Sequence, residues 1–317
     1  MISFRYHIVS IVSVFLALAV GVALGGGPLK GEVDNTLVEQ VESDRRAKAG
    51  LQADILALEA TNEFSDTFAR TAAPGLINVA VQGRVVTMVV LPGASPDSVT
   101  SIGGFVTQAG GTVGGTLRVG EKLVDVGTKQ LVDELASQLL DGTPDVTVAE
   151  DASGYERMGA LIARAIGTPE DAGAAVDDTT NSILAGLSTA GLMSADGELP
   201  RRGSLVLFVA GTRDGSSEDK QGANSIIISL AKAIDAGTDG VAVAGPVPSA
   251  RADGLVNAIR SDVEAAREIS TVDALPRTAG ELITVMALGE QAQGEVGHYG
   301  ALEAPDGAMP GAIPAPQ

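Results

Sequence analysis

The sequence predicts an α/β protein in three parts: one N-terminal transmembrane helix, a coiled-coil stalk, and a mainly parallel, doubly wound sheet with an inserted or covering helical segment. Three observations predict it. An uncharged apolar run opens the chain, a heptad-like pattern follows, and short β-branched runs then alternate with helical patterns. The 317 residues are 45% hydrophobic but only 3% aromatic, so the core must consist mainly of Val, Leu, Ile and Ala.

The first element is the apolar run over residues 8–26, which carries no charge. As a helix it spans about 28 Å, close to the hydrocarbon thickness of a bilayer. Arg5 and His7 precede it, which places residues 1–7 in the cytoplasm and the body outside, in a single-pass protein of the cell membrane. A cleaved signal peptide and a buried core helix are the alternatives. The run is longer than the apolar region of a typical signal peptide, which favours a retained anchor in the lipid bilayer.

Small residues recur at every fourth position of this run: Ser13, Ala17, Gly21 and Gly25. This spacing lets two membrane helices approach closely. It therefore indicates self-association of the anchor, although Gly and Ala are common in membrane helices in general.

The second element is the stalk, residues 30–64. Steps of four and three residues from Leu37 define one seam of a helix, whose apolar members are Leu37, Val41, Leu51, Ile55 and Leu58 and whose polar members are Asp44, Lys48 and Asn62. This is the pattern of a short coiled coil with a weak centre, and it predicts a homodimer. A surface helix packed on its own domain would have a similar pattern.

The third element is an extracytoplasmic α/β domain over residues 76–300. Strands are expected over 83–92, 112–120, 203–211, 240–246 and 269–275, the last as a strand or a turn. Helices are expected over 96–111, 129–140, 154–167, 178–193, 222–237, 250–262 and 279–294, with a strand as the alternative for the last. Continuous apolar strands that alternate with helices are typical of a parallel sheet. The tail, residues 301–317, holds four prolines and is expected to be disordered.

Doubly wound sheets bind ligands beyond the carboxyl ends of their strands. The loops expected there are 210–222 and 244–254, and Arg213, Asp214, Arg251 and Asp253 could converge in a crevice between them. Neither a Walker A sequence nor a dinucleotide fingerprint after a strand is present. Solvated loops with capping acids are the alternative interpretation.

Composition and motifs argue against several functions. A formal net charge of −19 repels nucleic acid, and the lack of cysteine excludes thiolate metal sites and a cysteine nucleophile. There is no GxSxG elbow, and a triad of Ser270, His298 and Asp273 has nothing to single it out. No catalytic residues and no resident cofactor are therefore predicted.

His298 is the one histidine outside the anchor region, in the stretch GEVGHYG at 294–300. Copper sites favour thiolate, thioether or imidazole ligands, and one histidine with scattered methionines does not form a ligand set. We therefore expect His298 to be structural, bonded to backbone at a sheet edge. A partner contact and a weak metal ligand remain the alternatives.

Four stretches carry a family resemblance: the start MISFRYHIVSIVSVFLALAVGVALG, ISTVD at 269–273, ITVMAL at 283–288, and GEVGHYG at 294–300. In this order and spacing they resemble the actinobacterial MctB/SteB family over nearly the full chain. The resemblance implies two roles. One is copper transport or homeostasis in the cell envelope, including the outer envelope. The other is cell separation, in which a cytosolic SteA-like partner is linked to activation of a peptidoglycan hydrolase.

The residues help to weigh these roles. A pore needs a closed barrel or several helices, whereas one span and a parallel sheet are expected here. An anchor, a stalk and a head without a catalytic set favour a non-enzymatic adaptor in cell separation. Copper transport or homeostasis is the alternative, with copper as a cargo whose ligands are scarce in the sequence.

Overall fold

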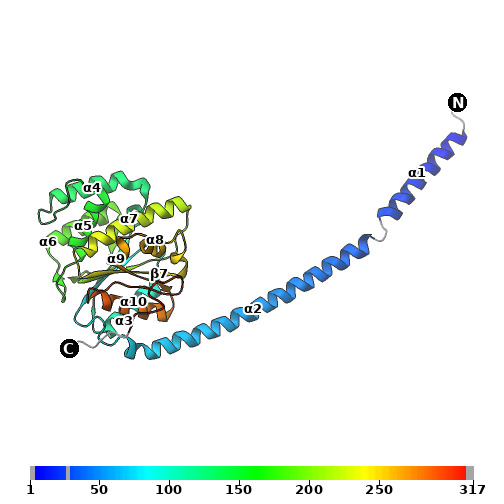
Figure 1. Ribbon diagram of the computed structural model, residues 1–317. Helices are drawn as coiled ribbons and strands as arrows, with labels where there is room; N and C mark the ends of the chain where they lie inside the picture. Colours follow the sequence, from blue (N-terminus) through cyan, green and yellow to red (C-terminus); the bar gives the residue numbers. More distant parts are fainter. Residues whose placement is uncertain (1–3, 26–28, 312–317) are drawn as a thin grey trace. The chain divides into compact units, whose positions relative to one another are not determined.

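The computed structural model describes residues 4–25 and 29–311, with side chains described from residue 5 to 25 and from residue 37 onward (Figure 1). The chain divides into two compact units, Met1–Phe64 and Ser65–Gln317. We call the second the α/β unit and describe each unit by itself.

Helix α1 (Phe4–Gly25) contains the stretch Arg5–Gly25, which is long and apolar enough to cross a membrane. The apolar N-terminal helix predicted from the sequence is therefore present. Its expected last residue, Gly26, and the first three residues of the N-terminal segment lie outside the described residues.

Helix α2 (Leu29–Leu76) is longer than the stalk predicted over 30–64. It continues through Gly50 and through Pro74 to Leu76. The apolar seam residues of α2 are all exposed, with exposed fractions of 58% for Leu37, 47% for Val41 and 63% for Leu51. A single helix gains nothing from apolar side chains in water, so this seam is available for a second helix. The coiled coil itself stays a prediction.

The α/β unit is built on a seven-stranded sheet in the order β4-β2-β1-β6-β7-β8-β9. All neighbours are parallel except β2 and β4. The strands are β1 (Val85–Val90), β2 (Thr112–Val119), β4 (Met193–Ala195), β6 (Leu205–Val209), β7 (Gly240–Pro246), β8 (Ile269–Leu275) and β9 (His298–Tyr299). A separate pair joins β3 (Ala174–Ala175) to β5 (Arg201–Arg202). The mainly parallel α/β fold predicted from the sequence is confirmed.

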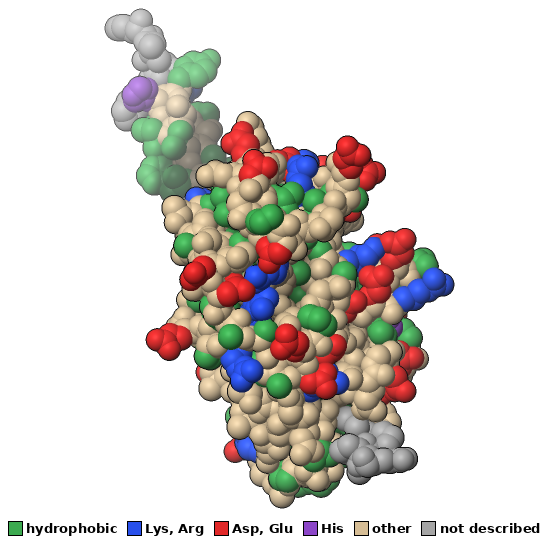
Figure 2. All heavy atoms as spheres, turned by 90° about the vertical axis from the view of Figure 1, so that its left-hand side faces the viewer, with side chains coloured by type: hydrophobic (Ala, Val, Ile, Leu, Met, Phe, Trp, Pro, Cys, Tyr) green, Lys and Arg blue, Asp and Glu red, His purple; other side chains and the backbone are tan. Residues whose placement is uncertain are grey.

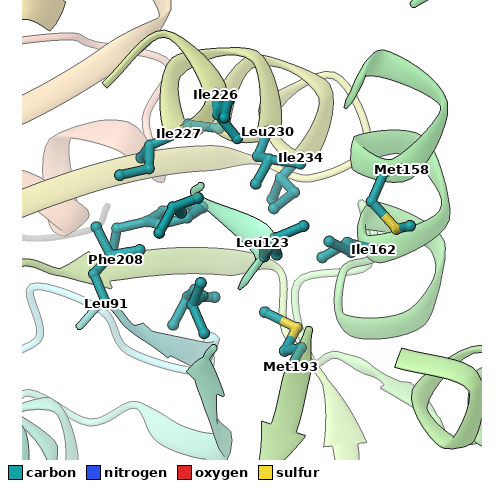
Figure 3. Close-up of a cluster of buried hydrophobic side chains, with 14 of the residues drawn as sticks. Leu91, Leu123, Met158, Ile162, Met193, Phe208, Ile226, Ile227, Leu230 and Ile234 are labelled. Carbon is teal, nitrogen blue, oxygen red and sulfur yellow. The ribbon is translucent and has the colours of Figure 1, made fainter. Parts of the chain in front are cut away.

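Helices cover both faces of the sheet (Figure 1). One layer holds α4 (Lys129–Asp141), α5 (Gly154–Ile166), α6 (Asp178–Ala190), α7 (Ser217–Asp235), α8 (Leu255–Ser261) and α9 (Ala265–Glu268). The other holds α3 (Pro96–Gln108), α10 (Thr278–Gln291) and the end of α2. The helical segment expected over 150–196 thus belongs to the first layer. Its apolar side chains meet those of the strands and α7 around Phe208, Leu123 and Met158 (Figure 3).

The differences from the predicted elements have local causes. Helix α7 begins five residues before the predicted start because Ser216 and Asp219 form a capping box. Strands β4 and β9 are too short to give an alternating pattern. The tail from residue 301, expected to be disordered, is ordered at its start, since Ala301 and Leu302 donate backbone hydrogen bonds to Asp273. Residues 312–317 of that tail lie outside the described residues.

The end of α2 is fixed to the α/β unit by polar contacts. Asp66 accepts a hydrogen bond from the backbone N–H of Thr278 at 3.1 Å, and Arg70 donates to the hydroxyl of Thr278 at 3.3 Å. Asp66 thereby caps the first turn of α10, whose own preceding residue, Arg277, provides no side-chain cap. Together with the buried Ala69 and Ala73, these contacts make the last turns of α2 part of the second layer.

The exposed seam of α2 generates a prediction about self-association. In L51K/I55K, two lysines replace apolar seam residues, and we expect crosslinking between copies in membranes to fall several-fold because charges do not pack at a helix seam. The matched control is A53K/A60K, which adds the same charge to exposed positions on the opposite side of the helix. Equal crosslinking in the seam variant and the control would contradict a dimer through this seam.

Candidate functional site

A crevice of about 340 Å³ opens at the carboxyl ends of β1, β6 and β7. After β1 the chain crosses to β2 on one side, whereas β6, β7 and β8 follow one another on the other side. The sheet order therefore reverses between β1 and β6, which is where ligands bind in open α/β sheets. Leu91 and Pro92 follow β1, residues 210–213 follow β6, and both segments line the crevice.

Two glycines let the loops after β1 and β6 meet. Gly93 has φ +80°, which favours glycine, and a Cβ on Gly211 would overlap the backbone of Gly93. The loop after β6 then runs without helix or strand to Ser216. The backbone N–H groups of Gly211, Thr212 and Arg213 donate no hydrogen bond within the described part of the chain.

Three cationic side chains from three different segments line the crevice: Arg213 after β6, Lys220 on α7 and Arg251 after the 3₁₀ turn Val247–Ala250. Arg213 pairs with Glu121 at 3.2 Å, and Lys220 pairs with Asp253 at 3.0 Å. This hydrogen bond from Lys220, followed by the attraction of its charge, lowers the pKa of Asp253 below 3.8. Arg251 is exposed, and its guanidinium makes no ion pair or hydrogen bond within the described residues.

The structure brings together three of the four residues predicted for this crevice. Arg213, Arg251 and Asp253 line it, whereas Asp214 is exposed and is not among the lining residues. Sequence reasoning missed Lys220 and Asn224, which reach the crevice from α7. The early start of α7 at its capping box was the available signal, because it places these residues on the first turns of a helix that follows β6.

His298 lies on β9 at the edge of the sheet and is 9% exposed. Its Nδ1 is 2.9 Å from the Thr271 hydroxyl, and its Nε2 is 3.0 Å from the Ala266 carbonyl oxygen. Burial lowers the pKa of the ring below 6.5, and the charge of Arg260 lowers it further. Because the Ala266 carbonyl only accepts, Nε2 carries the proton and Nδ1 accepts from Thr271. Both ring nitrogens are therefore engaged within the fold, as expected for a histidine bonded at a sheet edge.

The side chains of Ser270, His298 and Asp273 do not form a catalytic triad. Ser270 Oγ accepts hydrogen bonds from Gln291 and from the N–H of Gly297, whereas the His298 ring meets Thr271. Successive residues of a strand point to opposite faces, so Ser270 and the His298 ring lie on different sides of the sheet.

Asp273 takes part in a polar cluster, which we call the Arg260 cluster. Arg260 is 8% exposed and pairs with the fully buried Asp273 at 3.4 Å. It also donates to the Thr271 hydroxyl and to the carbonyl oxygens of Tyr299 and Leu302. The cluster joins α8, β8, β9 and the start of the tail. A Cβ on Gly300, where φ is +140°, would overlap the Asp273 carboxylate, so glycine is required there.

Metal-ligating groups do not converge in the described part of the chain, which holds no group of three or more His, Cys, Asp or Glu side chains suited to a metal ion. Met88, Met158, Met193 and Met286 are buried among apolar residues, and Met309 is 42% exposed. Figure 2 shows one face of the protein, with carboxylates spread over the surface and basic side chains among them. Such a surface offers only dispersed oxygen ligands.

A second hollow, of about 400 Å³, is acidic and contains Asp235, the last residue of α7. Burial, and then the charge of Glu268, raise the pKa of Asp235 to about 6. Lys232 and Glu156 also line this hollow. Asp235 thus ionises close to neutral pH in the folded protein.

Comparison with known proteins gives one consistent result. The sequence profile of the family described as "Copper transport outer membrane protein, MctB" matches residues 1–310. The proteins named "Copper transporter MctB" of Mycobacterium tuberculosis and Mycobacterium bovis are 28% identical over 308 residues, which cover 95% of this chain and 96% of theirs. The protein of that name from Mycobacterium leprae is 26% identical over 310 residues, with the same coverage.

The raised pKa of Asp235 predicts a pH-dependent stability. The folded state holds this proton more tightly than the unfolded chain, so the contribution is present below about pH 4 and is lost as pH rises through about 6. The loss is about 1 to 2 kcal/mol once solvent screening of this half-buried group is allowed for. D235N should therefore melt higher than the unmodified protein at pH 8, with a gap that closes toward pH 4. The matched control is D141N, which changes an exposed aspartate at the end of α4. An equal rise of the melting temperature at pH 8 in D141N would show that burial of Asp235 is not the cause.

The contacts of His298 predict a structural effect of its removal. H298A loses two hydrogen bonds and leaves a small cavity, which should cost about 2 to 4 kcal/mol and lower the melting temperature by several degrees. Because the pKa of the folded ring is lowered, the protein loses stability as pH falls through about 6.5, and H298A should lack this component.

Copper stoichiometry, measured on the same purified full chain, should not change in H298A. The control is H7A, which removes the exposed imidazole of α1 and should leave melting unchanged. Tight copper binding that vanishes in H298A with unaltered melting would instead make His298 a ligand.

Proposed function

The chain belongs to the MctB family, and on that premise we propose that it is a membrane-anchored, non-enzymatic cell-envelope protein that takes part in copper transport or homeostasis. The observation that carries the proposal is the match over residues 1–310, which includes both the apolar helix and the α/β unit. The relatives that match over the same length are named copper transporters. The orientation follows from the charge pattern, with the N-terminus in the cytoplasm and the α/β unit outside.

The residues of the α/β unit do not fit a resident copper site. Copper favours imidazole, thiolate and thioether ligands. The sequence has no cysteine, both ring nitrogens of His298 are bonded within the fold, and four methionines are buried apart from any histidine. We therefore place the copper role at the level of an assembly of several chains, in which copper is the cargo. The exposed seam of α2 supports such an assembly because it leaves apolar side chains for a second helix.

A second candidate function is that of an adaptor in cell separation, which links a cytosolic SteA-like partner to activation of a peptidoglycan hydrolase outside the membrane. The specific observation in its favour is that the described part of the chain holds one helix long and apolar enough to cross a membrane, followed by a 48-residue helix. One such span suits the passage of a signal between two proteins better than the passage of an ion, which needs a lined path.

The two candidates predict different phenotypes for a strain that lacks the gene. If the copper role is right, cellular copper measured by mass spectrometry should rise in copper-containing medium and return to normal when the full chain is restored. The L51K/I55K variant should restore it poorly if assembly is required, whereas the A53K/A60K control should restore it fully. Chains of unseparated cells with normal copper would reject the copper role and support the adaptor.

A further inference from the structure

We infer that the crevice between β1 and β6 is a binding site for a phosphate monoester of about mononucleotide size. This inference goes beyond the proposed function and does not rest on it, because it comes from the geometry of the crevice alone. Three properties carry it: the position of the crevice, the donors that converge on it, and its apolar floor.

Position is the first property. The crevice lies at the reversal of strand order, at the carboxyl ends of β1, β6 and β7, where open α/β sheets bind ligands. Its volume of about 340 Å³ falls within the range of small-molecule sites. The glycines at positions 93 and 211 let the loops after β1 and β6 approach each other beside this space, since a Cβ at either position would collide with the opposite loop.

The donors are the second property. In a chain of net charge −19, three cationic side chains line one small crevice. Arg251 has no partner within the described residues. Arg213 pairs there only with Glu121, which is 71% exposed and therefore competes weakly with a bound anion for this guanidinium. Residues 211–213 also line the crevice, and their backbone N–H groups donate no hydrogen bond to any residue that the structure describes. Guanidinium groups and backbone N–H groups are the donors that hold phosphate oxygens.

The floor is the third property and explains why the ligand should be an ester and not a free anion. The crevice also has apolar lining residues, namely Leu91, Ala210, Ile227 and Leu255. Leu91 and Ile227 also belong to the hydrophobic core, near Phe208 (Figure 3). A ligand with one phosphate and an apolar ring would bury the ring on this floor. The carboxylate of Asp253, held by Lys220, offers an acceptor to a hydroxyl group of the same ligand.

The test uses the full chain in detergent micelles and isothermal titration calorimetry with three probes: adenosine 5′-monophosphate, inorganic phosphate and adenosine. We expect saturable binding of the monophosphate that weakens as salt is raised, weaker binding of phosphate, and little binding of adenosine. R213Q/R251Q should weaken binding of the monophosphate by about tenfold or more, because two charge-assisted contacts are lost.

R267Q is the matched control. Arg267 is an exposed arginine on α9 that is not among the residues lining the crevice, so its replacement should leave binding unchanged. Melting curves of each variant show whether the fold is kept. The inference is overturned if neither phosphate probe gives saturable binding, if adenosine binds as tightly as its monophosphate, or if a folded R213Q/R251Q protein binds like R267Q. Phosphate that binds as tightly as the monophosphate would support the anion site but reject the role of the floor.

Discussion

The central strands of the α/β unit are buried on both faces, and this constraint determines what surrounds them. Every residue of β1 and β6 is buried, so neither face of the sheet can meet water. One helical layer covers each face, and the second is completed by Ala69 and Ala73 on the last turns of α2 and by Ile77 directly after it. Because both faces are covered by helices, a ligand can reach the sheet at the ends of the strands, and the crevice lies there, where the strand order reverses. The crevice is thus a consequence of the topology.

Polar contacts between distant segments hold the periphery of this core. Asp66 caps α10 from a different element, Arg84 at the start of β1 pairs with Asp171 and Asp239, and the Arg260 cluster fixes β9 and the start of the tail. In each case a long-range polar contact replaces apolar packing at a place where the chain is too short or too exposed to bury much surface. A buried partner left alone would be costly, so these contacts favour one arrangement of the segments over others.

Much of the fold could be predicted from the sequence, because its strands are continuous apolar runs and its helices are bounded by glycines and capping residues. The strand expected over 203–211, which is β6 in the structure, is an example. Strands β4 and β9 could not be predicted, because two or three residues are too few to show an alternating apolar pattern. These residues form strands only through pairing with β2 and β8. For the crevice, Arg213, Arg251 and Asp253 could be predicted because the loops that follow parallel strands lie at one edge of the sheet. Lys220 was missed because its position depends on where α7 begins, which the capping box of Ser216 and Asp219 could have indicated. The bonds of His298 depend on Ala266 and Thr271, which no local pattern connects to it.

The Arg260 cluster has a consequence for how the protein is made. Asp273 accepts hydrogen bonds from the N–H groups of Ala301 and Leu302, and Arg260 donates to the carbonyl oxygens of Tyr299 and Leu302. All three residues follow β8 in the chain and are synthesised after it. Until those residues have left the ribosome, β8 is an open edge and the Asp273 carboxylate lacks its N–H donors. The nascent domain therefore closes its sheet only after residues 298–302 have been made. A product that stops short of residue 298 keeps an exposed strand edge that proteases can recognise, so the fold itself makes such a truncated chain a substrate for removal.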